Sequence, residues 1–196
     1  MGILWLPLRA LTPINTFLLR IGRNLAWVCL MLMVVVILAQ VVMRYVVGSA
    51  LPWSEELARF FMLWMTGIIA PSAYRWGGFV AIDMLPRALP RVPALLLNLV
   101  ILLLGLVVLI TGIRIGYSEV TGFGGKFNSA SLKVPMSLIG GESFAVKKAY
   151  MFASLWVCCI LMVLVSIELI LRNIIALADS DADLPDDPDM IVAGAD

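Results

Sequence analysis

Long apolar runs separated by short polar segments dominate the hydrophobic pattern of the chain. The clearest run covers residues 24–43, about 20 residues, and as a helix it would be about 30 Å long, the thickness of the hydrocarbon core of a bilayer. Similar segments cover residues 53–75, 94–117 and 149–171. The pattern predicts an all-α integral membrane protein with four transmembrane helices over these ranges.

The two ends of the chain have different patterns. In residues 1–23, Thr12 suits a helix cap and Pro13 suits a first helical position, which predicts an N-terminal helix at the membrane interface. One face of that helix would hold Leu11, Ile14, Leu18 and Ile21. Residues 176–196 are rich in aspartate and proline, so we expect a disordered acidic tail after a membrane domain of residues 24–175.

Composition agrees with a membrane protein. The chain is 62% apolar and 14% charged, whereas soluble domains carry about 25% charged residues. Its formal net charge of +1 comes without a basic stripe, which argues against a nucleic-acid partner.

The absence of histidine from the sequence excludes imidazole-ligated haem, most zinc sites and His-based catalytic triads. The cysteines Cys29, Cys158 and Cys159 lie inside apolar runs, and the last two would point to different sides of a helix. We therefore expect no cofactor, no metal and no enzymatic activity.

Unusual charges gather in residues 44–83. Arg44 precedes the turn between the first two predicted membrane helices, Glu55 and Glu56 begin the second helix, and Arg59 follows one turn later. Because charges near a membrane need partners, we predict one cluster of these four side chains. Two roles stay open for it, fixing the helical hairpin and docking another protein.

This stretch also resembles a known family. The order RY-x-x-G-x-x-L-x-W-S-E-E-L-A-R, followed by an apolar run, R-x-G-G and I-D, is similar to the small, DctQ-like membrane subunit of tripartite ATP-independent periplasmic (TRAP) transporters. The later segment SASLKVPMSL is similar to the family's segment before its last helix. The positions that we carry over from the motif are Tyr45, Gly48, Trp53, Ser54, Arg75, Gly77, Gly78 and Asp83.

The resemblance implies an accessory stator subunit in a secondary transporter that imports an organic acid, with sodium coupling. It implies two protein partners, a large membrane subunit that carries the substrate and sodium sites and a periplasmic binding protein, so this chain would bind no substrate itself. Membrane lipid would surround it. Candidate contacts to the binding protein are Lys126, Lys133, Lys147 and Lys148.

Basic residues predict the orientation in the bacterial inner membrane. One side of the predicted topology holds Arg9, Arg20, Arg23, Arg75, Arg87, Arg91 and Arg172. The other side holds Arg44 and the four lysines just named, most of them in the longest loop, which counts least. Both termini are therefore expected in the cytoplasm.

A different class of function is a self-contained small carrier coupled to protons or cations. Its carboxylates would be Glu55, Glu56 and Glu168, which lies near the end of the last predicted helix with Arg172 four residues later. Paired carboxylates near an interface make poor proton sites at the membrane midplane, so the stator subunit is the favoured interpretation.

Overall fold

Four long helices lie side by side in the computed structural model of the chain, which describes residues 2–49, 51–76, 90–134 and 144–178. Their bounds are α1 Gly2–Tyr45, α2 Ser54–Arg75, α4 Arg91–Thr121 and α6 Ala149–Ala178. A short helix α5 (Phe123–Lys126) and two strands, β1 (Asn128–Val134) and β2 (Phe144–Lys147), connect α4 to α6. The helical class is therefore as predicted.

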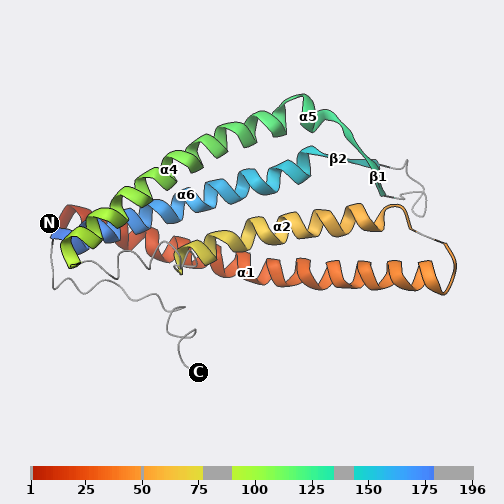
Figure 1. The fold of residues 1–196 in the computed structure, drawn as a ribbon, viewed down its shortest axis with the longest axis horizontal. Helices are drawn as coiled ribbons and strands as arrows, with labels where there is room; N and C mark the ends of the chain where they lie inside the picture. Colours follow the sequence, from red (N-terminus) through yellow and green to blue (C-terminus); the bar gives the residue numbers. More distant parts are fainter. Residues whose placement is uncertain (1, 50, 77–89, 135–143, 179–196) are drawn as a thin grey trace, which may run out of the picture.

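The helices form a row with two distinct ends (Figure 1). Helix α4 packs against α6, α6 against α2, and α2 against α1. The start of α1, the end of α2, the start of α4 and the end of α6 share one end of the row, called here the terminal end. The opposite end, where β1 and β2 lie, is called the hairpin end.

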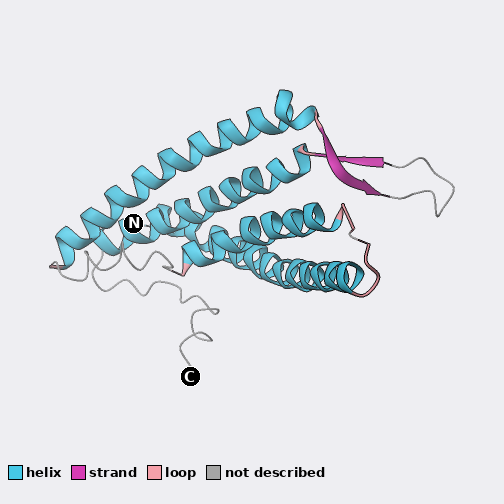
Figure 2. Cartoon of the chain, turned by 45° about the vertical axis from the view of Figure 1, so that its right-hand side comes forward, coloured by secondary structure: helices cyan, strands magenta, loops and turns pink. Residues whose placement is uncertain are grey.

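Strands β1 and β2 pair antiparallel and project beyond the ends of α4 and α6 (Figure 2). The register pairs Val134 with Phe144 and Lys133 with Ala145, then shifts, so that Asn128 lies opposite Lys147. The apolar pattern did not predict this hairpin, because its strands are short and contain no long apolar run.

Helix α1 runs without a break through residue 23, where the sequence analysis placed a boundary between an interfacial helix and the membrane domain. Its 44 residues correspond to about 66 Å, twice the hydrocarbon thickness. The prediction that Thr12 caps a helix is wrong: its hydroxyl donates to the carbonyl of Leu8 at 2.9 Å, and Pro13 lies inside the helix.

The two faces of α1 are the reverse of those in a soluble helix. The side chains that face the bundle are mostly small or polar, and the large apolar ones face outward, with Phe17, Trp27 and Met31 each about two-thirds exposed. The predicted apolar face is also on the outside, since Ile14 is 54% exposed. The buried positions recur every three or four residues: Leu8, Thr12, Asn15, Leu19, Gly22, Ala26 and Cys29. Small residues inside and large ones outside are typical of helices that pack within lipid.

Glycines set the spacing between neighbouring helices. A Cβ atom added to Gly67 of α2 would lie 2.8 Å from the carbonyl oxygen of Ser154 in α6, and one added to Gly22 of α1 would lie 2.8 Å from the side chain of Ile68 in α2. On the other side of α6, a Cβ at Gly112 would lie 3.1 Å from the sulfur of Cys159. These contacts bring the backbones close together, as expected for helices that associate by van der Waals packing.

The buried cysteines fit this arrangement. Cys158 and Cys159 are both 8% exposed, and the first faces Gly67 of α2 while the second faces Gly112 of α4. The prediction that they point to different sides of one helix is confirmed.

Three helical segments are long and apolar enough to cross a membrane by length and composition, namely Leu11–Tyr45, Val92–Thr121 and Ala149–Leu177. Helix α2 matches the predicted range 53–75. It is less apolar than the other three long helices, and it is not one of the three candidate segments found in the described residues. Its length of 22 residues, about 33 Å, equals the hydrocarbon thickness.

Candidate functional site

A buried ion cluster joins three helices near the terminal end of the bundle. Glu168 of α6 is completely buried, and its Oε1 accepts a hydrogen bond of 2.8 Å from Nη2 of Arg75, whose side chain is 4% exposed. Arg172, one turn later in α6, donates to the same oxygen from Nη2 at 2.9 Å and from Nε at 3.1 Å. Two guanidinium groups therefore share one carboxylate.

Helix α1 completes the cluster. Nδ2 of Asn15 donates to the other oxygen of Glu168, Oε2, at 2.8 Å, and Nη1 of Arg75 donates to the hydroxyl of Thr16 at 2.8 Å. Asn15 also lies 3.3 Å from the carbonyl oxygen of Leu164, a further bond to α6. We refer to Asn15, Thr16, Arg75, Glu168 and Arg172 as the buried cluster.

Hydrogen bonds of this kind fix helix register. Burying charges costs free energy, and only close pairing with further hydrogen bonds offsets that cost. Both oxygens of Glu168 have donors, and Arg75 reaches α6 and α1 from the two arms of one guanidinium. Any slide of α2 along α6 would break these bonds, so the buried cluster specifies one arrangement of α1, α2 and α6.

Two further polar contacts hold α2 to α6. The hydroxyls of Tyr74 and Ser166 lie 2.9 Å apart, next to the buried cluster. In the middle of α2, Nε1 of Trp64 donates to the carbonyl of Tyr150 at 3.1 Å. Polar contacts therefore join α6 to the second half of α2.

The predicted charge cluster lies at the hairpin end and is open to solvent. Glu55 and Arg59 are 3.1 Å apart at i and i+4, with side chains 75% and 64% exposed. Glu56 is half-buried in the same turn, and Arg44 is exposed in the last turn of α1. The structure pairs Glu55 with Arg59, and a joint cluster of all four side chains stays a prediction.

The motif residues have distinct structural positions. Gly48 has φ +73°, a left-handed conformation that favours glycine, and this lets the chain turn from α1 toward α2. Ser54 is fully buried and its hydroxyl donates to the carbonyl of Leu51 at 2.8 Å, while Tyr45 is 78% and Trp53 38% exposed. Gly77, Gly78 and Asp83 lie outside the described residues, as does the predicted acidic tail from residue 179 on.

The four lysines all lie at the hairpin end. Lys126 ends α5, Lys133 is in β1, Lys147 ends β2 and Lys148 precedes α6. Lys126, Lys147 and Lys148 are exposed, and the backbone amide of Lys148 donates to the carbonyl of Phe127 at 3.0 Å. The pairing of β1 with β2 therefore brings lysines from both ends of the connection between α4 and α6 to the hairpin end of the bundle.

These observations define the class of protein, a helical membrane protein whose buried charges bond its helices to one another. The described ranges contain no group of three or more metal-ligating side chains. Comparison with protein families matches residues 33–176 to "Tripartite ATP-independent periplasmic transporters, DctQ component". The chain belongs to this family, the small component of TRAP transporters, and is a multi-pass inner-membrane transporter subunit and not an enzyme. Comparison with curated proteins finds no match.

Part of the buried cluster was predictable from the sequence. The spacing pairs Glu168 with Arg172, and Arg75 belongs to the family motif, but the link between Arg75 and Glu168 and the roles of Asn15 and Thr16 were not predicted. A signal was present, because a lone acidic residue in an apolar run requires partners. The sequence could not say which of the distant polar residues provide them.

Proposed function

We propose that this chain is the stator subunit of a sodium-coupled TRAP-type transporter that imports an organic acid. It would hold a large membrane subunit, which moves the substrate, in a fixed position in the bilayer, and a periplasmic binding protein would deliver the substrate. The carrying observation is the buried cluster, which bonds α1, α2 and α6 to one another. A stator must resist displacement, and interlocked buried charges resist sliding of helices.

We propose that all four long helices cross the membrane. Helix α2 has the least apolar sequence of the four, but it packs between α1 and α6, both of which have candidate spans. Its neighbours would keep lipid from much of its surface, so it can carry more polar residues than they do. Four crossings return the chain to its starting side, and the distribution of basic residues supports the cytoplasm as that side.

The hairpin end would then face the periplasm. Exposed charges of both signs support this end as a docking surface for the binding protein, namely Glu55 and Arg59 on α2 and Lys126, Lys147 and Lys148 around the hairpin. Exposed charges contribute mainly to the rate of encounter and to specificity.

A self-contained carrier has less support. Such a carrier needs a carboxylate that can bind and release a cation during transport. The oxygens of Glu168 are already engaged by Arg75, Arg172 and Asn15, and Glu55 lies exposed at an end of the bundle. Neither is an available binding group within the bundle.

The test is reconstitution of uptake in liposomes with a sodium gradient. We expect no uptake of labelled organic acids with this chain alone, and uptake when the large subunit and the binding protein are added. We also expect the chain to co-purify with the large subunit from membranes. Uptake by the chain alone would overturn the proposal, and so would uptake of equal rate by the large subunit and binding protein without it.

A further inference from the structure

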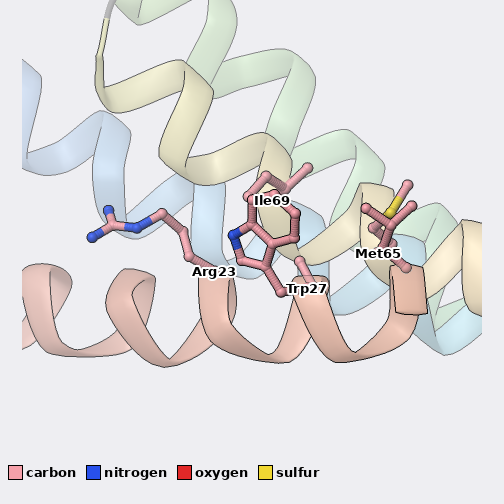
Figure 3. A pocket seen from close by; sticks show the side chains of 6 residues that line it. Arg23, Trp27, Met65 and Ile69 are labelled. Atoms are coloured by element: carbon pink, nitrogen blue, oxygen red, sulfur yellow. The ribbon is translucent and has the colours of Figure 1, made fainter. Parts of the chain in front are cut away.

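An apolar groove with a cationic end runs along the outside of the bundle between α1 and α2 (Figure 3). Its volume is about 280 Å³. The side chains that line it are Arg23, Ala26, Trp27, Leu30, Met65 and Ile69. All but Arg23 are apolar or aromatic.

The arginine lies at the terminal end of this groove. Its guanidinium carbon is 4.9 Å from the centre of the ring of Trp76, the residue that directly follows α2. Tryptophan at the end of a membrane helix is typical of the headgroup level. From Arg23 the groove extends along α1 to Leu30, about 10 Å along the helix and away from the terminal end.

We propose that this groove binds one anionic phospholipid, with an acyl chain along Trp27, Met65 and Ile69 and the phosphate at Arg23. The groove has the polarity of such a lipid, a charge at the headgroup level and apolar walls below it. Guanidinium groups bind phosphate through parallel N–H donors, and the Trp76 ring lies against the guanidinium group of Arg23. Arg20, exposed one turn earlier on α1, adds a second positive charge near the same level.

The dimensions argue for an acyl chain over other occupants. A volume of 280 Å³ is at the lower limit of small-molecule sites, about 300–1,000 Å³, and a helix about 10 Å in diameter would not enter the groove. A free phosphate would leave the apolar part empty. A phospholipid fills both the apolar part and the cationic end of the groove. The positive charge of Arg23 favours a lipid with an anionic headgroup over one with no net charge.

Native mass spectrometry of the full-length subunit in mild detergent tests the proposal, with dioleoyl phosphatidylglycerol and dioleoyl phosphatidylcholine as probes. We expect the wild type to retain phosphatidylglycerol more strongly than phosphatidylcholine. Arg23→Gln should weaken phosphatidylglycerol binding about tenfold, since it removes a charge-assisted hydrogen bond. Arg9→Gln, an equal charge change at an exposed arginine of α1 that does not line the groove, is the control and should leave binding unchanged.

A second pair of variants tests the apolar part. Leu30→Trp should fill the groove and lower the retention of both lipids, whereas Val35→Trp, at a position 59% exposed outside the groove, should not. Circular dichroism and melting curves check that each variant is folded. Equal binding of phosphatidylglycerol by wild type and Arg23→Gln would overturn the proposal, as would equal binding of the two lipids by the wild type.

Two further outcomes identify other occupants. Displacement of phosphatidylglycerol by millimolar inorganic phosphate would mean that the site recognises a free anion and not a lipid. In cells, a photo-cross-linking amino acid in place of Trp27 should label lipid. Labelling of a polypeptide at that position would show that a protein covers the groove and would overturn the assignment.

Discussion

Arg75 and Glu168, 93 residues apart in the sequence, form an ion pair of 2.8 Å with side chains 4% and 0% exposed. Arg75 begins the R-x-G-G motif, so this family position has a structural role that can be named. It attaches the end of α2 to α6 and, through Thr16, to α1. The motif arginine is a link between helices, and no substrate needs to be invoked to explain its presence.

Glu168→Gln should destabilise the subunit strongly. The change leaves two arginines near a neutral amide, and removing one partner of a buried ion pair costs about 3–5 kcal/mol. Glu55→Gln is the matched control, because Glu55 also pairs with an arginine at i+4 but is exposed, and such pairs contribute about 0–1 kcal/mol. Thermal melting of the two variants in the same detergent measures the difference. Equal melting temperatures would contradict a structural role for the buried cluster.

Arg75→Lys should also destabilise the bundle, although it keeps the charge. A lysine ammonium is a single point of contact, whereas the guanidinium of Arg75 donates to Thr16 and Glu168 from separate arms. The loss of one buried hydrogen bond predicts a cost of about 1–3 kcal/mol. Arg172→Lys is the comparison, because Arg172 pairs with Glu168 at i+4 on the same helix and is more exposed than Arg75, 19% against 4%. If the two lysine variants have the same melting temperature, Arg75 does not act as a bridge between helices.

Gly67→Ala and Gly105→Ala should have effects of opposite sign. The added methyl group at Gly67 would lie 2.8 Å from the backbone oxygen of Ser154, so α2 and α6 must separate, at a cost of about 1–3 kcal/mol. At Gly105 the nearest atom, the hydroxyl of Tyr74, would be 3.7 Å away, an ordinary contact, and alanine raises helix propensity by up to about 1 kcal/mol. Chemical denaturation in one detergent compares them. A stabilised Gly67→Ala variant would refute close packing at this point.

The double variant Glu55→Gln with Glu56→Gln separates the two roles of the hairpin-end charges. Because Glu55 is exposed, we expect the membrane complex to keep its melting temperature while the affinity of the binding protein falls, most at low salt. Glu119→Gln, an exposed acid near the end of α4, is the control. A lower melting temperature with unchanged affinity would instead assign the cluster a structural role.

The long helices were predictable from the sequence, and their packing was not. Residues 53–75 were predicted and α2 covers Ser54–Arg75, because an apolar run bounded by proline and charge is a local signal. The inward face of α1 was not identified, since the sequence analysis considered only the apolar face of residues 1–23. In lipid, small or polar residues such as Asn15 and Gly22 mark the contact face.

The buried cluster illustrates why the site could be predicted only in part. Glu168 and Arg172 are neighbours on one helix turn, and spacing alone pairs them. The contacts of Glu168 to Asn15 and Arg75 depend on how three helices pack, and the spacing of residues along the chain does not reveal which distant positions meet. The exposed pair of Glu55 and Arg59 was predictable for the same local reason as Glu168 and Arg172.

The position of Glu168 in the last helix also bears on how the protein is made. Helices leave the ribosome in chain order, so Asn15 and Arg75 are synthesised long before their acidic partner. Arg172 accompanies Glu168 on the same helix turn, and the two charges can therefore enter the membrane already paired, at a lower cost than a lone carboxylate. Helix α6 is then the closing element of assembly, and a nascent chain that stops before residue 168 leaves Asn15 and Arg75 without their carboxylate partner.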